Sequence, residues 1–97
     1  MTHYVAVQIV PKDMEVLNRY FAVGRAALEK HGGKVVAGGP DSKVLEDHGA
    51  GDPVKVLAQF PAAASAEAWI NDPELADVHA MRREGAHTPI TLLPPLE

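Results

Sequence analysis

Valine and isoleucine alternate with other side chains along residues 3–10, and Pro11 ends this run. β-Branched residues at every second position are typical of a strand with one fully apolar face. The other face carries Tyr4, Ala6, Gln8 and Val10. Because only one of these four side chains is strongly polar, the run predicts a strand with both faces at least half buried.

A helix is predicted to start after Asp13, which is a suitable N-cap, with Glu15 adding a favourable charge in the first turn. Apolar or small residues then recur at three- and four-residue steps, as one buried stripe requires. The stripe consists of Leu17, Tyr20, Phe21, Gly24, Ala27 and Leu28. Gly32 and Gly33 supply a left-handed backbone that ends the helix.

The pattern becomes extended again at residues 34–37, is interrupted by Gly38 and Gly39, and resumes at residues 43–46. Paired glycines let a backbone bend without a Cβ clash, so we expect one long bent strand with a bulge or turn at the glycines. At least one of the two should have a positive φ. Residues 47–53 are rich in turn formers and are expected to lead into an antiparallel strand at 54–60.

The last third of the chain predicts two short helices and a final strand. Pro61 opens an alanine-rich helix that runs through Asn71, with Trp69 and Ile70 as its large anchors. Residues 72–74 read Asp-Pro-Glu, which is a helix start signal, and the second helix fades at Gly85. A short strand is predicted at residues 89–93, before two further prolines.

The order strand, helix, strand, strand, helix, strand predicts a single α+β ferredoxin-like domain over residues 1–97. In this topology both helices cover one face of an antiparallel sheet, and the strand at 3–10 lies beside the strand at 54–60. The uncovered face would carry Tyr4, Gln8, Leu57 and Gln59. A second copy of the chain is the simplest cover for such a half-apolar face, so a homodimer is predicted.

Composition narrows the range of partners. The 97 residues carry a net charge of −4, so no positive field is available for nucleic acid. The chain has no cysteine, which excludes disulfides, thiolate zinc sites and a cysteine nucleophile. No apolar stretch approaches the ~18 residues that would span a membrane, and the first residues lack the pattern of an export signal. A cytoplasmic protein without membrane contact is therefore expected.

The strongest candidate for chemistry is the pair His79 and Arg82, three residues apart on the last predicted helix. An imidazole beside a guanidinium can bind a carboxylate or enolate oxygen and move a proton. Arg83 lies four residues from His79 and belongs to the same neighbourhood. The alternative is an ordinary solvated helix face that also includes Asp77 and Glu84.

Three further residues are candidates for binding a substrate. Trp69 and Asn71 precede the proline-capped helix, where a chain reversal can aim them at a cavity. Tyr20 can line a pocket between the first helix and the sheet, on the same helix face as His31. Core packing of Trp69 and Tyr20 and a local backbone role for Asn71 are the alternatives.

No cofactor or metal is predicted. Glu46 and His48 share the parity of a strand end, but two ligands do not make a metal site and no further ligand pattern supplies a third. Neither glycine pair has the frame of a phosphate-binding loop.

Several strings together resemble the small bacterial proteins of the domain of unknown function 1330 family: GGKVVAGG at 32–39, VLED at 44–47, KVLAQFP at 55–61 and AEAWINDPEL at 66–75, with Arg82 beyond them. The chain departs from the usual pattern of this family at Ala37, Gly49, Ala62 and Leu75. The resemblance implies a dimeric α/β barrel, in which two ferredoxin-like sheets pack face to face. Relatives in that superfamily include cofactor-free monooxygenases, haem-degrading enzymes, lactone isomerases and ligand-sensing domains, so the fold alone does not choose a function.

Two hypotheses follow. In the first, the chain is a cofactor-independent enzyme, similar to a monooxygenase or an isomerase, that holds a small organic molecule between helices and sheet. Arg82 would anchor an acidic group, His79 would act as acid or base, and Trp69, Asn71 and Tyr20 would line the pocket. In the second, the chain is a non-catalytic ligand-sensing or structural homodimer in which these residues pack and cap.

Overall fold

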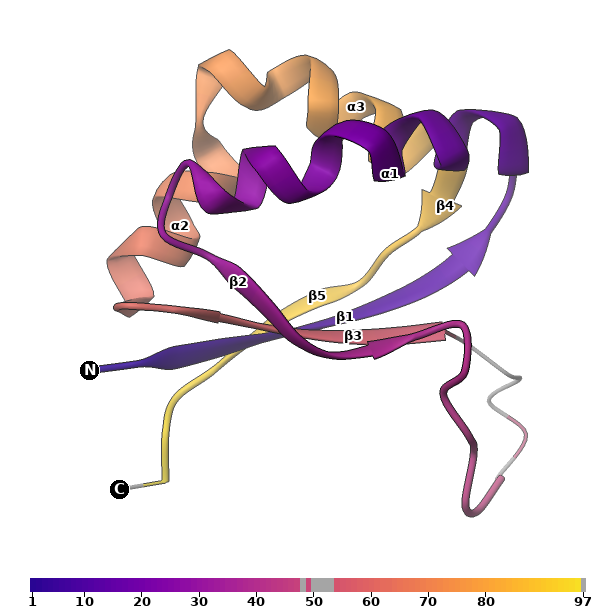
Figure 1. The fold of residues 1–97 in the computed structure, drawn as a ribbon, viewed down its shortest axis with the longest axis horizontal. Helices are drawn as coiled ribbons and strands as arrows, with labels where there is room; N and C mark the ends of the chain where they lie inside the picture. The colour runs from indigo at the N-terminus through magenta and orange to yellow at the C-terminus, as the bar shows by residue number, and fades with distance from the viewer. Residues whose placement is uncertain (48, 50–53, 97) are drawn as a thin grey trace.

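A layer of helices covers one face of an antiparallel sheet in the computed structural model, which describes residues 1–47, 49 and 54–96 (Figure 1). The elements in chain order are β1 (His3–Pro11), α1 (Met14–Glu29), β2 (Lys34–Gly39), β3 (Val54–Phe60), α2 (Ala63–Asn71), a 3-10 turn η1 (Pro73–Leu75), α3 (Ala76–Gly85), β4 (Ala86–His87) and β5 (Ile90–Leu93). In the described part of the chain, no helix has both the length and the apolar character needed to cross a membrane.

The sheet has the order β2-β3-β1-β4, and β5 also pairs with β1. β1 and β3 are antiparallel neighbours at the centre, in a register that runs from His3 opposite Phe60 to Ile9 opposite Val54. The α+β ferredoxin-like fold predicted from the element order is thereby confirmed. The short strand β4 was not predicted, because two paired residues leave no periodic pattern in a sequence.

The first helix begins as its sequence predicts. The Asp13 carboxylate accepts hydrogen bonds from the backbone N–H groups of Glu15 and Val16, at 3.1 and 3.4 Å. The helix ends before Gly32, which has a φ of 78°. Most of the predicted stripe faces the sheet, but the prediction is wrong for Phe21, which remains 49% exposed. The stripe is narrower at this point because part of the space below α1 is hollow.

The paired glycines end β2 instead of bending a longer strand. Gly38 and Gly39 have φ values of 111° and 122°, so the predicted positive φ is confirmed. A Cβ on Gly38 would lie 2.1 Å from the carbonyl oxygen of Lys55, which requires glycine there. The expected continuation at 43–46 is wrong: the glycine conformations and Pro40 turn the backbone away from β3, and a register shift occurs earlier, between Val35 and Ala37. Of the predicted loop, residues 48 and 50–53 lie outside the described residues.

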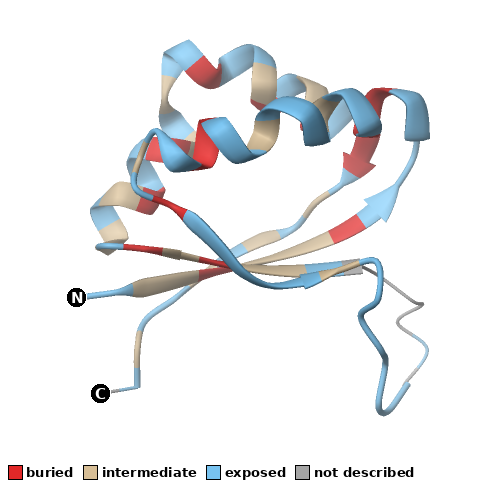
Figure 2. Ribbon diagram, in the orientation of Figure 1, coloured by how far each residue is buried: buried red, intermediate tan, exposed pale blue. Residues whose placement is uncertain are grey.

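The core lies between the helices and the sheet, and Figure 2 shows buried residues in elements of both layers. Phe60, Leu17 and Val5 are the largest fully buried side chains. The rings of Phe60 and Trp69 pack with their centroids 5.6 Å apart, so the predicted anchor of α2 does hold that helix on the sheet. The opposite face of the sheet has no helix over it (Figure 1).

Candidate functional site

A cavity of about 660 Å³ lies between α1 and the sheet. Its floor comes from β1, β3 and β5, its roof from α1, and one side from β2 with the turn at residues 38–40. Most of its lining is apolar, and the titratable side chains among the described lining residues are Tyr20, Arg25 and Arg82. A volume of this size suits a small organic molecule, since ligand pockets typically measure about 300–1,000 Å³.

Arg82 is the unusual member of this lining. Its side chain is only 4% exposed and makes no ion pair with any described residue. Nη1 donates a hydrogen bond to the Thr88 hydroxyl, Nη2 lies 3.5 Å from Nδ1 of His79, and Nε is buried without a partner among the described residues. Burial lowers the pKa of Arg82, but a guanidinium keeps its proton in proteins. The cavity therefore contains a buried, uncompensated positive charge, which is a costly arrangement.

Tyr20 brings a hydroxyl to the same cavity. Burial raises the pKa of its phenol, and the positive charge of Arg82 partly offsets that rise. The phenol is therefore protonated at neutral pH and can donate a hydrogen bond. The ring lies across Gly24, where an added Cβ would come within 2.8 Å of the ring, so the glycine makes room for the tyrosine.

His79 lies behind the cavity lining instead of on it. It is 2% exposed, and its ring packs edge-on against Trp69 with centroids 5.2 Å apart. Its Nε2 lies 2.9 Å from the Trp69 carbonyl oxygen, and because a carbonyl only accepts, Nε2 carries the proton and Nδ1 faces Arg82 as an acceptor. Burial lowers the pKa of His79, helped by the charges of Arg82 and Arg83. His79 therefore lies beside Arg82 as predicted, but as an uncharged side chain that supports the guanidinium of Arg82.

Of the other two predicted binding residues, the structure brings only one to the cavity. Trp69 contributes to the lining, and its buried Nε1 has no hydrogen-bond partner among the described residues. Asn71 is exposed, and its side-chain amide donates to the Glu67 carbonyl oxygen at 2.9 Å. This is the local backbone role that the sequence left open as the alternative.

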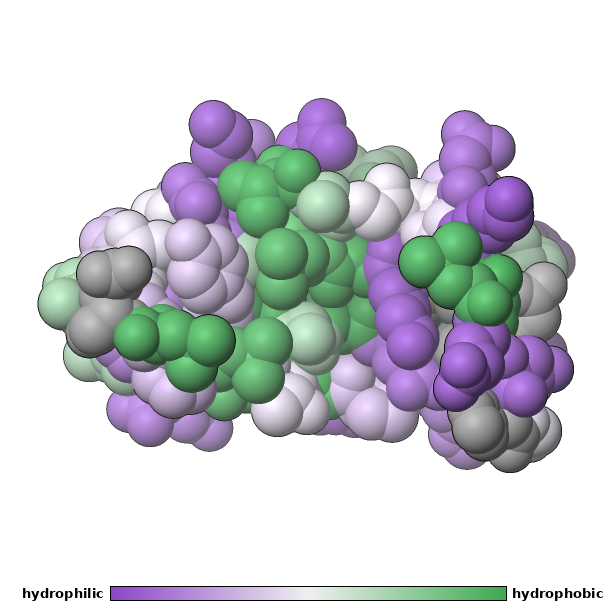
Figure 3. All heavy atoms as spheres, turned by 90° about the horizontal axis from the view of Figure 1, so that it is seen from below, coloured by the Kyte–Doolittle hydropathy of each residue, from purple (hydrophilic) through white to green (hydrophobic). Residues whose placement is uncertain are grey.

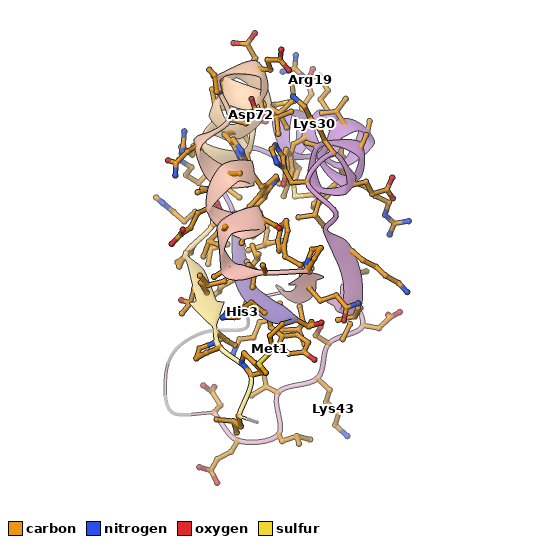
Figure 4. All side chains as sticks on the ribbon, turned by 90° about the vertical axis from the view of Figure 1, so that its left-hand side faces the viewer. Met1, His3, Arg19, Lys30, Lys43 and Asp72 are labelled. Atoms are coloured by element: carbon orange, nitrogen blue, oxygen red, sulfur yellow. The ribbon has the colours of Figure 1, made fainter. Side chains whose placement is uncertain are left out.

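A second polar cluster joins the end of α1 to the segment after α2. Asp72 accepts from Lys30 Nζ and from His31 Nε2, each at 2.8 Å, and Lys30 also pairs with Glu74. Lys30 and Asp72 lie side by side near the top of Figure 4. The hydrogen bond from Lys30, followed by that from His31, lowers the pKa of Asp72 well below its usual value. His31 is therefore engaged away from the cavity that Tyr20 lines.

Sequence reasoning missed Arg25, which lines the cavity from α1, and the partners of Asp72. Arg25 directly follows Gly24 of the predicted stripe, at a helix position next to that stripe, and contributes to the lining of the cavity under α1. The described residues include no group of three or more histidines or carboxylates that is able to hold a metal ion. Of Glu46 and His48, the two residues considered as metal ligands from the sequence, His48 lies outside the described residues.

The model of a family described as a domain of unknown function, DUF1330, matches residues 2–95. The chain belongs to the DUF1330 family. No curated protein sequence matches this DUF1330 chain.

Solved structures share the fold of this DUF1330 protein at low sequence identity. A protein of unknown function from Rhodopseudomonas palustris has a TM-score of 0.76 at 20% identity, covering 99% of this chain and 83% of that one. A dimeric ferredoxin-like protein of unknown function from Jannaschia sp. has a TM-score of 0.70 at 14% identity, covering 98% and 100%. SnoaB, a cofactor-independent oxygenase from Streptomyces nogalater, has a TM-score of 0.65 at 12% identity, covering 99% and 93%. At these identities the likeness establishes the fold alone.

Proposed function

We propose that this protein binds a small, mainly apolar organic molecule in the cavity under α1, with an anionic group of that molecule on Arg82. The observation that carries the proposal is the buried guanidinium without an acidic partner among the described residues. A carboxylate or enolate oxygen in the cavity would supply the missing negative charge for this guanidinium. The phenol of Tyr20 would donate a further hydrogen bond to the same group.

Binding is better supported than proton abstraction by the protein. An enzyme that abstracts a proton needs a base within hydrogen-bond reach of its substrate. The described lining contains no carboxylate and no imidazole, and His79 directs both ring nitrogens at other protein groups. In place of the predicted acid–base role, we propose that His79 positions Arg82, by accepting from its Nη2.

A cofactor-independent enzyme is the second candidate, and the likeness to SnoaB favours it. In that case Arg82 would stabilise the oxyanion of an enolised substrate, and Tyr20 would be the uncharged titratable group that the described lining offers to it. A non-catalytic, ligand-sensing protein would require only the binding step. Both candidate functions require an anionic group of the ligand on Arg82, and this shared step can be tested directly.

The test compares 1-octanol with octanoate, which have the same apolar chain and differ in the charge of the head. Isothermal titration calorimetry should show tighter binding of octanoate, and Arg82→Met should remove this preference while octanol binding persists. Arg19→Met is the matched control, because Arg19 is exposed and does not line this cavity. An unchanged preference for octanoate in Arg82→Met would remove Arg82 from the site.

We also propose that the uncovered face of the sheet is buried by a second copy of the chain. Register places Tyr4 opposite Gln59 and Leu93, and Ala6 opposite Leu57, on this face. Figure 3 views the molecule from this side and shows hydrophobic atoms gathered in the middle, with hydrophilic atoms beside them. An apolar centre with a polar rim is the usual anatomy of an interface, and one protein of the same fold is described as dimeric.

Light scattering after size-exclusion chromatography should give twice the monomer mass. Leu57→Lys places a charge at the centre of the proposed interface and should give a folded monomer. Val23→Lys makes the same kind of change on exposed α1, outside the cavity lining, and should leave the dimer intact. A parent protein that is monomeric at tens of micromolar would exclude the homodimer.

A further inference from the structure

A second hollow, of about 370 Å³, opens on the surface at the end of α3. Its lining consists of Lys12, Arg82, Arg83, Ala86, His87, Thr88 and Pro89. Four of these seven described side chains are basic and none is acidic, although the chain as a whole carries a net charge of −4. We call this hollow the basic recess. Its charge is opposite to that of the molecule, so it is a local feature that the composition does not explain.

The basic recess and the cavity under α1 share part of their walls. Arg82 and Thr88 belong to the lining of both, and the guanidinium of Arg82 donates to the Thr88 hydroxyl. A group that reaches Arg82 from the apolar cavity therefore has the basic recess directly beyond it. This contact links an apolar chamber to a positively charged one.

Backbone hydrogen bonds join the segments that carry the basic side chains of the recess. The N–H groups of Lys12 and Asp13 both donate to the Gly85 carbonyl oxygen, at 2.8 and 3.0 Å. β1 and β4 pair through Val10 and His87. Arginines in the last turn of α3 suit the negative end of a helix, but this explains only Arg82 and Arg83. Lys12 and His87 come from other elements, and the fold brings them to the same place.

We propose that the basic recess receives the doubly charged oxyanion head of the molecule whose apolar body occupies the cavity under α1. This inference rests on the proposed function and specifies the ligand: an apolar phosphate monoester or a dianion of similar size. Arg82 would hold the head at the junction, while Lys12 and Arg83 would pair with the outer oxygens. A phosphate head offers three acceptor oxygens and nearly two negative charges, which fits several cations converging from different elements.

The experiment compares octyl phosphate with octanoate by isothermal titration calorimetry at pH 8, where the phosphate head is mostly a dianion. Inorganic phosphate is titrated separately, to distinguish a lipid-like head from a free oxyanion. Lys12→Gln and Arg83→Gln each remove one charge from the basic recess. Lys43→Gln is the matched control, because Lys43 lines neither hollow and Figure 4 shows it projecting away from the helices and the sheet.

We expect octyl phosphate to bind about tenfold tighter than octanoate. Each recess variant should weaken octyl phosphate by about threefold and change octanoate by less than about twofold, because exposed charge pairs contribute modestly. Lys43→Gln should change neither affinity. Octanoate and octyl phosphate binding equally well would overturn this inference and leave the proposed function standing. Inorganic phosphate binding as tightly as octyl phosphate would overturn it as well, and failure of octanoate, octanol and octyl phosphate alike to bind would overturn both.

Discussion

Charged side chains are paired near the C-terminal end of α1, whereas a charged side chain is buried without an acidic partner among the described residues near its N-terminal end. Beyond its C-terminal end, Lys30 and His31 both donate to Asp72, and Lys30 reaches Glu74 as well. Near its N-terminal end lies Arg82, which is almost completely buried and has no acidic partner among the described residues. In the first group two residues are exposed, two are half-buried and every charge has a partner, whereas the second group buries a cation alone.

This difference separates charges that serve the fold from a charge that costs stability. A paired cluster joins the end of α1 to the segment between α2 and α3 and needs nothing from outside the chain. A buried cation with an unpaired N–H is tolerated where a ligand completes it, and residues that lower stability in this way concentrate at functional sites. The comparison makes Arg82 the residue whose removal should stabilise the fold and weaken binding.

The largest expected effect comes from Arg82→Met in the protein without ligand. Methionine fills similar space without the charge, so the free energy of unfolding should rise by about 1–2 kcal/mol, after the loss of the hydrogen bond to Thr88 is included. For a domain of this size, that corresponds to a Tm at least about 4 °C higher. Thermal unfolding followed by circular dichroism measures it, with Arg83→Met as the exposed control. A clear fall in Tm with unchanged octanoate binding would mean that Arg82 is a structural residue.

The paired cluster should behave in the opposite way when it is broken. Asp72→Asn removes the acceptor of Lys30 and His31, and we expect a Tm several degrees lower at neutral pH. The folded protein holds the pKa of Asp72 below its ordinary value of 3.8. The stabilisation is therefore complete above that value and is lost as the pH falls below it, so the two proteins should converge in acid.

Thermal unfolding between pH 7 and pH 2 tests this convergence. Asp77→Asn is the matched control, because it removes a carboxylate from exposed α3 where no described residue pairs with it. A constant difference between Asp72→Asn and the parent over the whole range would show that the carboxylate charge does not produce the stabilisation.

The sequence predicted local structure better than the details of the site, because local signals act over a few residues. The Asp13 cap and the positive φ at Gly38 and Gly39 depend on neighbouring atoms, and they are present as predicted. His79 and Arg82 do lie together, as their three-residue spacing indicates. The direction of the His79 ring depends on the Trp69 carbonyl at the end of another helix, and a spacing rule contains no information about that group.

Other errors arise from competition between local and tertiary effects. Residues 43–46 have strand composition, but they follow two positive-φ glycines and a proline, so they do not meet β3. Phe21 has stripe spacing but lies over a hollow and stays half exposed. Periodicity reports which residues share a helix face, and it does not report whether the opposite layer fills the space below that face.

The smallest expected effect is a change in the pH dependence of stability when His79, the neighbour of the unpaired Arg82, is replaced. Burial lowers the pKa of His79 below its ordinary 6.5, so the unfolded chain binds a proton more readily than the folded protein does. Stability should therefore be complete above about pH 6.5 and fall as the pH drops below it. His79→Gln keeps an N–H donor for the Trp69 carbonyl and cannot become charged, so its Tm should decline less than that of the parent between pH 7.5 and pH 5.5. His87→Gln, which removes an exposed imidazole, is the matched control and should retain the pH dependence of the parent. If His79→Gln declines as steeply as the parent, protonation of His79 does not limit stability, and the neutral support assigned to it beside Arg82 would have to be abandoned.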